Sequence, residues 1–355
     1  MKKRFASILL VLFLAGCTET VILPESSSEA VSSISASSGT ISISSQEAIS
    51  SAASSPVSSQ EVSSVPVPSQ ATSSVVIPPE APCSANVAPT LPSNFGKEGG
   101  VTVDQLKVGT KYVGYAEKLC SLPNAATQTR PQGVVFDGSR FYMTNFSNDK
   151  PESRVILSVF DDKGNLIRTS EKLDLDHANS LTYVPKKNAL YVASCQSNDD
   201  EAAYYRYSVI DIESLTIVEQ AEKEKPFFAL GYSSEKDMFG SGQWSGGTLD
   251  IWDGDFNHIT SVNVLTHGTL SQGVYCTDEG IWFIRSHQKG YVTELLLYDW
   301  EGHLLHEILL PEFAEEAEDI VYIQDGTFWF ASKWTERFMA QGANIWSVKF
   351  YELEQ

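Results

Sequence analysis

Short apolar runs separated by polar turn residues dominate the chain after residue 130. Five of these runs share one pattern and recur about every 45 residues, a spacing typical of repeat architectures. They occupy residues 131–136, 178–183, 227–232, 271–276 and 317–322. Runs this short, with turn signals on both sides, predict β-strands and not helices.

A second apolar run follows each of the five across a short turn, at residues 141–143, 190–192, 238–239, 281–283 and 328–330. Four of the five units continue with a third strand and a second turn, at Asp161–Asn165, Asp211–Ser214, Trp252–Asp255 and Asp299–Gly302. A fourth run closes the unit, as at 304–310. Four antiparallel strands repeated in this way are typical of a β-propeller blade. The pattern predicts an all-β fold, a five-bladed β-propeller of four-stranded blades, within residues 83–355.

The fifth unit lacks a fourth strand after its third run, Asn344–Phe350. A strand-like run without a unit of its own, Lys111–Leu119, precedes the first repeat. We expect this early run to pair with the third strand of the last unit, because that pairing closes the ring and covers unpaired sheet edges.

The N-terminal part of the chain has a different composition. Lys2, Lys3 and Arg4 precede an apolar run from Phe5 to Leu14, a pattern typical of a secretory signal peptide over residues 1–16. The apolar run is too short to span a bilayer. Residues 17–82 are mostly Ser, with Pro, Ala, Val, Gln and Glu, and predict a linker that buries too little apolar surface to fold.

The end of the signal, Leu14-Ala15-Gly16-Cys17, resembles the lipobox of bacterial lipoproteins. The resemblance implies that Cys17 is the lipidation site, carrying diacylglycerol or palmitate, and that cleavage leaves it as the new N-terminus. It also implies an exported protein, anchored to a membrane through this lipid, whose folded domain faces the cell surface or the periplasm.

Charge and cysteine content narrow the partners further. The formal net charge of -20 at pH 7 disfavours nucleic acid and anionic lipid head groups, so the lipid and not the protein surface makes the membrane attachment. We expect a monomer. Export permits disulfides, and Cys83 and Cys120 flank the entry to the domain, so this pair is the candidate for a disulfide, with two free thiols as the alternative. Cys195 and Cys276 lie in strand-like runs and are expected to be buried thiols.

Polar residues gather where the first strand of each unit begins and the second ends. In a propeller these positions converge at one end of the central channel, where they suit a small polar ligand. The candidate pocket residues are Gln132, His177, Asn179, Trp244, Gln272, Arg285, His287, Glu318 and Lys333. The alternative is that these groups only satisfy backbone atoms where the strands crowd together.

Calcium is the one cofactor to weigh, at two acidic segments. The run from Glu312 to Asp319 is interpreted as a solvated loop, and Asp253–Asn257 as a hairpin turn. We therefore expect no cofactor. Calcium at one of these two segments is the alternative.

The domain is remotely similar to glutaminyl cyclases of the plant and bacterial type. Gln132-Gly133 resembles the Thr-Gln-Gly that opens their first blade, and Ser332-Lys333-Trp334 resembles the end of their last blade. Asn179 stands where that family has Glu. The favoured function is a lipid-anchored envelope module that binds a small polar, peptide or glycan ligand. The alternative is an extracytoplasmic enzyme of glutaminyl-cyclase or glycan-active type.

Overall fold

The computed structural model describes residues 90–126, 129–147, 155–195, 205–243, 247–266, 269–286, 293–336 and 339–354. All of them belong to one structural unit, Ile77–Gln355. The predicted signal peptide, Cys17 and the whole predicted linker lie outside the described residues. In the part of the chain that is described, no helix is long and apolar enough to cross a membrane.

Strands make up nearly all the regular structure of the described residues, with two short 3-10 helices, η1 (Val103–Gln105) and η2 (Pro185–Lys187). Three antiparallel sheets have four strands each, joined in chain order. The first consists of β2 (Thr129–Phe136), β3 (Phe141–Ser147), β4 (Val155–Phe160) and β5 (Leu166–Thr169). The second consists of β6 (Ser180–Val184), β7 (Ala189–Ala193), β8 (Arg206–Asp211) and β9 (Thr216–Glu222). The third consists of β10 (Ala229–Ser233), β11 (Met238–Gly242), β12 (Thr248–Asp253) and β13 (His258–Asn263).

The remaining sheet has eight strands in the order β14-β15-β16-β17-β1-β20-β19-β18. Its strands are β1 (Tyr112–Pro123), β14 (Leu270–Cys276), β15 (Ile281–Ser286), β16 (Thr293–Tyr298), β17 (Leu304–Leu310), β18 (Ala317–Gln324), β19 (Thr327–Glu336) and β20 (Met339–Glu352). The strands predicted from the five repeats are therefore present in the expected order.

Strand β1 joins the two ends of the folded region. It pairs antiparallel with β20 from Tyr112↔Glu352 to Pro123↔Gly342. The prediction that the early run lies beside the third strand of the last unit is thus confirmed. Its parallel pairing with β17 is limited to Tyr112↔Ile308 and Val113↔Leu309. This short contact merges two four-stranded groups into one eight-stranded sheet, where the sequence predicted two separate sheets.

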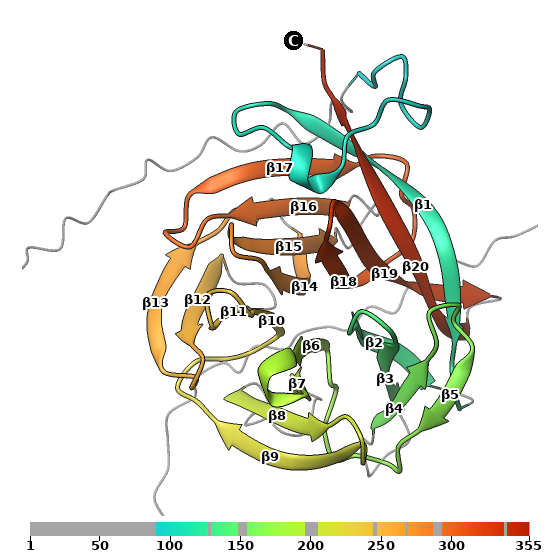
Figure 1. Ribbon diagram of the computed structural model, residues 1–355, viewed down its shortest axis with the longest axis vertical. Helices are drawn as coiled ribbons and strands as arrows, with labels where there is room; N and C mark the ends of the chain where they lie inside the picture. Colours follow the sequence, from blue (N-terminus) through green and yellow to red (C-terminus); the bar gives the residue numbers. More distant parts are fainter. Residues whose placement is uncertain are drawn as a thin grey trace, which may run out of the picture. The chain divides into compact units, whose positions relative to one another are not determined.

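The sheets are arranged around a common centre, with the first strand of each group innermost (Figure 1). Each inner strand contacts the next, from β2 to β6, β10, β14 and β18 and back to β2. The outer strands β5, β9 and β13 are largely exposed, whereas the inner strands are almost wholly buried. This is a propeller-like, all-β architecture.

Close approach of the inner strands depends on small residues at one repeated position. A Cβ added to Gly133 would lie 2.7 Å from the backbone nitrogen of Leu181 on the neighbouring strand. A Cβ added to Gly273 would lie 2.3 Å from Oδ1 of Asp319. Glycine therefore lets these backbones meet at distances that no other residue permits.

Aromatic side chains fill the space between neighbouring sheets. Between the second and third sheets, the rings of Tyr207 and Phe256 stack with centroids 4.3 Å apart, and Trp252 and Phe239 are buried in the same cluster. Burial of such large rings supplies most of the driving force that holds the sheets together.

The outer hairpin turns repeat one local device, an aspartate that accepts hydrogen bonds from the backbone of the following residues. Asp253 is representative, because its Oδ1 accepts from the amides of Asp255 and Asn257, both at 2.9 Å. Hydrogen bonds from Asn257 hold the pKa of the Asp253 carboxyl below its usual value. The Asp253 carboxylate, which was weighed above as a calcium ligand, thus accepts hydrogen bonds within its own hairpin turn.

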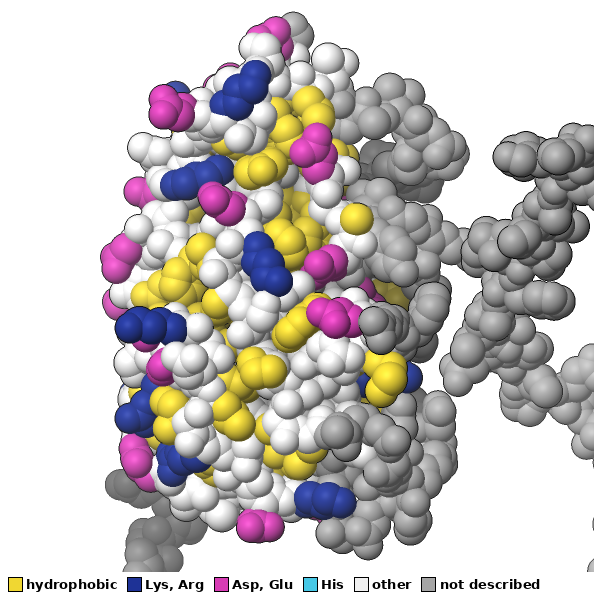
Figure 2. Space-filling model, turned by 90° about the vertical axis from the view of Figure 1, so that its right-hand side faces the viewer, with side chains coloured by type: hydrophobic (Ala, Val, Ile, Leu, Met, Phe, Trp, Pro, Cys, Tyr) yellow, Lys and Arg dark blue, Asp and Glu magenta, His cyan; other side chains and the backbone are white. Residues whose placement is uncertain are grey.

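The outer surface is mixed in character. On the side that carries β1 and β5, hydrophobic side chains lie among Lys, Arg, Asp and Glu (Figure 2). Leu119 and Ile167 are among the exposed hydrophobic residues. Such mixing is ordinary for strands whose outer face meets solvent.

Candidate functional site

Five equivalent residues near the start of the inner strands form what we call the inner-strand ring. They are Gln132, Asn179, Phe228, Gln272 and Glu318, and none is more than 9 % exposed. Four of the five were predicted as pocket residues. Their side chains are thus removed from bulk water, where an unmade hydrogen bond is costly.

Three ring residues coincide with irregularities in strand pairing. In β14, Ser271 pairs with Arg285 and Gly273 with Ile284, which leaves Gln272 without a register partner. Glu318 in β18 is left out in the same way between Ala317 and Asp319, and Gln132 lies in the shift of β2 between Pro131 and Val134. Such β-bulges re-aim a side chain and are common beside functional sites.

The two ring amides that donate hydrogen bonds do so to backbone carbonyls. Asn179 Nδ2 donates to the carbonyl oxygen of Phe228 at 3.2 Å and to that of Gln272 at 3.5 Å. Gln132 Nε2 donates to the carbonyl oxygen of Pro131 at 2.7 Å. Asn179 therefore links three neighbouring inner strands. For the two amides, this agrees with the alternative interpretation, in which the polar side chains satisfy backbone atoms.

Glu318 differs from the amides because one of its oxygens is unsatisfied. Oε1 is buried and has no hydrogen-bond partner, and the nearest cation, Nζ of Lys333, lies 3.7 Å away. Lys333 instead donates to Glu316 Oε2 at 2.8 Å. Burial raises the pKa of Glu318 to about 8, although the charge of Lys333 opposes the shift. A carboxyl with this pKa is protonated at neutral pH and can donate or accept a hydrogen bond.

The next residue, Asp319, is completely buried and has a different role. Its Oδ2 accepts hydrogen bonds from the amides of Val134 and Leu181, each at 3.2 Å, and its Oδ1 accepts from the amide of Ile320 at 2.9 Å. The carboxylate thereby ties β18 to β2 and β6. The interpretation of residues 312–319 as a solvated loop is therefore wrong for Glu318 and Asp319, because both belong to the buried inner strand.

Two other predicted residues, Arg285 and His177, contact their neighbours in the fold, although Arg285 Nη1 is also buried without a hydrogen-bond partner. Arg285 is completely buried, and it donates from Nε to Thr269 Oγ1 at 2.8 Å and from Nη2 to the Thr269 carbonyl at 2.7 Å. Burial lowers its pKa, while nearby Glu294 opposes that shift. The ring of His177 packs against Phe146, with centroids 4.6 Å apart.

Trp244 and His287 lie outside the described residues, as does Cys83. Because Cys83 lies outside the described residues, the Cys83–Cys120 disulfide stays a prediction. Cys195 and Cys276 are buried as expected, and burial raises the pKa of the Cys276 thiol.

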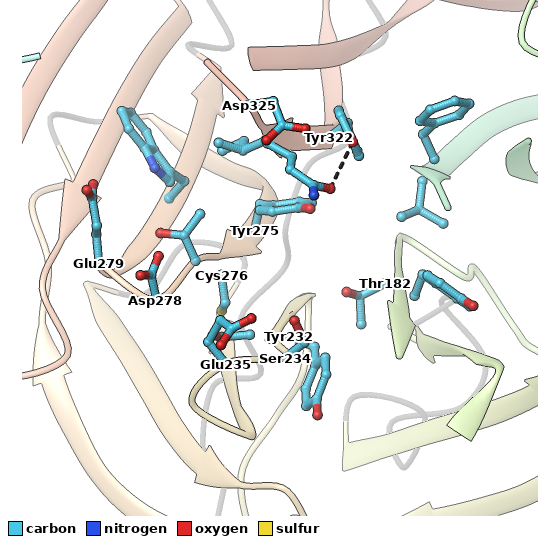
Figure 3. Close-up of a pocket in the computed structure, with 18 of the residues that line it drawn as sticks. Thr182, Tyr232, Ser234, Glu235, Tyr275, Cys276, Asp278, Glu279, Tyr322 and Asp325 are labelled. Atoms are coloured by element: carbon cyan, nitrogen blue, oxygen red, sulfur yellow. Dashed lines mark hydrogen bonds between the residues drawn. The ribbon is translucent and has the colours of Figure 1, made fainter. Parts of the chain in front are cut away.

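A cavity of 390 Å³ lies at the opposite end of the inner strands, where they lead into the hairpin turns (Figure 3). Its lining includes Tyr232, Tyr275 and Tyr322, from β10, β14 and β18, and none of the residues predicted for the pocket. The sequence held a signal for it, because the sixth position of the repeated runs is aromatic in four of the five units. The cavity volume is within the roughly 300–1,000 Å³ range of small-ligand pockets.

Among the described residues, no group of three His, Cys, Asp or Glu side chains is placed to hold a metal ion.

Comparison with known proteins gives no family. No protein-family model matches the chain, and no curated protein matches it. Among solved structures, it is similar to Kuenenia stuttgartiensis hydrazine synthase, with 14% identity and a TM-score of 0.38 over 66% of this chain and 65% of that chain. It is also similar to a luciferin-regenerating enzyme, with 10% identity and a TM-score of 0.41 over 66% of this chain and 95% of that one. A member of the DUF4221 family from Bacteroides vulgatus has 9% identity and a TM-score of 0.41 over 68% and 99%.

The chain spans only about two thirds of the hydrazine synthase chain that it matches. All three similarities are weak, and no function of these proteins carries over to this chain.

Proposed function

We propose that this protein is a lipid-anchored, five-bladed β-propeller whose inner-strand ring binds a small polar ligand at the cell envelope. Five blades follow if the eight-stranded sheet is divided at its short parallel contact between β1 and β17. Each half then has four antiparallel strands, like the other three sheets.

The proposed anchor is the lipid on Cys17, and the Ser-rich segment 17–82 is the tether. As a flexible chain of about 65 residues, the tether would have a root-mean-square reach of roughly 45 Å. That reach would hold the domain clear of the membrane surface, and the lipobox resemblance supports the extracytoplasmic side. The acidic character of the chain agrees with an anchor that depends on lipid and not on protein charge.

The single observation that carries the binding proposal is the buried, unsatisfied Oε1 of Glu318 beside Lys333. A buried polar atom without a partner costs about 1–3 kcal/mol, so it is rarely retained without a reason. A hydroxyl or amide of a glycan or peptide would supply the missing hydrogen bond. Glu318 also lies at the register shift of β18, and such bulges are common beside functional sites.

The ring composition favours binding over glycan hydrolysis. Glycosidases of the common type need two carboxyl groups on either side of the scissile bond. In the ring only Glu318 is a carboxyl, and Asn179 occupies the position where a glutaminyl cyclase has Glu. The enzyme alternative rests on the pKa of about 8 at Glu318, which suits proton transfer near neutral pH.

The test uses the full-length protein with two probes, the dipeptide Gln-Ala and soluble fragments of bacterial cell-wall glycan. We expect saturable binding of at least one probe, weakened about tenfold or more by Glu318→Leu, which removes the acceptor. Glu301→Leu, on an exposed outer turn, is the matched control and should leave binding unchanged.

Release of ammonia from Gln-Ala, or cleavage of the glycan, that is lost in Glu318→Gln would replace the binding role with the enzyme alternative. Binding that Glu318→Leu leaves intact, or no binding of either probe, would overturn the proposal.

A further inference from the structure

The cavity at the turn end of the inner strands has aromatic walls. Phe136, Tyr183, Tyr232, Tyr275 and Tyr322 line it, together with Trp282. The labelled residues approach the cavity from several strands around the centre, with Thr182 on one side and Asp278 and Glu279 on another (Figure 3). The site is therefore shared between sheets and does not belong to any one of them.

Hydrogen bonds to turn residues hold three of these tyrosine rings in place. The hydroxyl of Tyr232 donates to Asp237 Oδ1 at 2.9 Å, and that of Tyr322 donates to Gln324 Oε1 at 2.8 Å. The hydroxyl of Tyr183 donates to Asn188 at 3.3 Å. The hydroxyls of Tyr183 and Tyr232 are thus bonded to residues outside the lining, and that of Tyr322 is bonded to Gln324 within it, so these rings are held in position and offer aromatic surface to a ligand.

All the charged side chains that line the cavity are acidic. The lining contains six carboxylates and no Lys, Arg or His among the residues that the structure describes there. Asp137 is used by its own turn, where it accepts from the Arg140 amide at 2.7 Å. Glu235, Asp278, Glu279 and Asp325 are exposed on the hairpin turns that form the rim.

Two lysines that precede β7, Lys186 and Lys187, are engaged elsewhere. Lys186 pairs with Asp237 and lies over the ring of Tyr232, with Nζ 5.7 Å from the centroid. Lys187 donates to the hydroxyl of Tyr191 at 2.8 Å. Neither lysine lines the cavity, so the rim keeps its negative charge.

We infer that this cavity binds a small organic cation, an ammonium or guanidinium group carried on an apolar body. The rim carboxylates attract the charge, and the aromatic walls cover the apolar body and interact with the cation through their π-faces. A hydrated metal ion would make no use of such walls, because it requires several oxygen ligands at one point. The inference is independent of the ligand proposed for the inner-strand ring.

The test compares benzylamine with benzyl alcohol, which has the same ring without the charge, by calorimetric titration of the full-length protein. We expect benzylamine to bind and benzyl alcohol to bind at least about tenfold more weakly. The double variant Asp278→Asn/Glu279→Gln should weaken benzylamine binding by a similar factor. Raising the salt concentration should also weaken it.

Asp162→Asn/Glu301→Gln is the matched control, because it removes the same net charge from two exposed outer turns. It should leave benzylamine binding within about twofold of the original, as screened distant charges contribute little. Tyr275→Leu removes one aromatic wall and should weaken binding, whereas Tyr275→Phe should not, and thermal melts establish that each variant is folded.

Equal binding of benzylamine and benzyl alcohol would overturn the inference, because the charge would then have no role. Equal weakening by the control variant would do the same, since it would reduce the effect to the overall field of an acidic protein. Stoichiometric calcium binding that excludes benzylamine would replace the organic cation with a metal site.

Discussion

At the scale of single residues, the contrast between Glu318 and Asp319 is the most informative feature of the molecule. Both are carboxylic acids, both are buried, and they are adjacent in the sequence. Asp319 accepts hydrogen bonds from three backbone amides, whereas Glu318 Oε1 accepts none. A fully satisfied buried carboxylate is structural, and an unsatisfied one is the better candidate for contact with a ligand.

The pKa of Glu318 predicts a specific pH dependence of stability. Its folded pKa of about 8 lies above the ordinary value of 4.5, so between these values the unfolded chain releases a proton that the folded protein keeps. Stability should therefore fall as the pH rises through this window. Urea unfolding of the original protein and of Glu318→Gln at pH 5 and pH 8 measures this. The stability difference between them should shift in favour of the variant at pH 8, on the order of a few kcal/mol. A difference that is the same at both pH values would contradict the raised pKa.

Asp319→Ala should destabilise the fold strongly. The substitution leaves the buried amides of Val134 and Leu181 without acceptors, and each unsatisfied group costs about 1–3 kcal/mol. Asp325→Asn removes an exposed charge that follows the same strand and keeps a residue type that tolerates the positive φ of 51° there, so it should change the unfolding free energy by less than about 0.5 kcal/mol. Urea denaturation of both variants checks the prediction, and equal effects would show that Asp319 is not a structural crosslink.

At the scale of elements, β1 is the strand on which closure of the sheets depends. It is the first strand of the described region, and it pairs with β20 near the end of the chain. Gly114 on this strand makes the approach possible, since a Cβ there would lie 2.3 Å from Cδ2 of Leu310 on β17. Pairing between segments so distant in sequence contributes to stability only in the complete fold.

Deletion of residues 90–118 should therefore lower the melting temperature substantially and cause aggregation, because it exposes the backbone edges of β20 and β17. Deletion of residues 30–75 from the predicted linker is the control, and should leave the melting temperature unchanged. Thermal melts and light scattering measure both effects. An unchanged melt after loss of β1 would mean that the remaining strands are stable with open edges.

At the scale of the whole molecule, the predicted lipid anchor determines where the domain acts. Cys17→Ser should prevent lipidation and move the protein from the membrane fraction to the soluble fraction, because the linker is too polar to hold it there. Fractionation followed by immunoblotting, with the original protein beside the variant, measures the change. Retention of the variant in the membrane fraction would contradict the lipobox prediction.

The sequence by itself determined the strand order, the turns and the pairing of β1 with β20. These features depend on local patterns, namely apolar runs of strand length, Asp-rich turns and a repeat with one strand missing. The same patterns also placed Gln132, Asn179, Gln272 and Glu318 at equivalent positions, and the structure buries all four.

Only the tertiary structure decided what those positions do. The bulge in β18 separates the surroundings of Glu318 from those of Asp319, and a bulge is a property of the pairing between strands, not of one strand. The described cavity lies at the turn end because side chains from neighbouring sheets enclose it there, and enclosure depends on how sheets distant in sequence pack together.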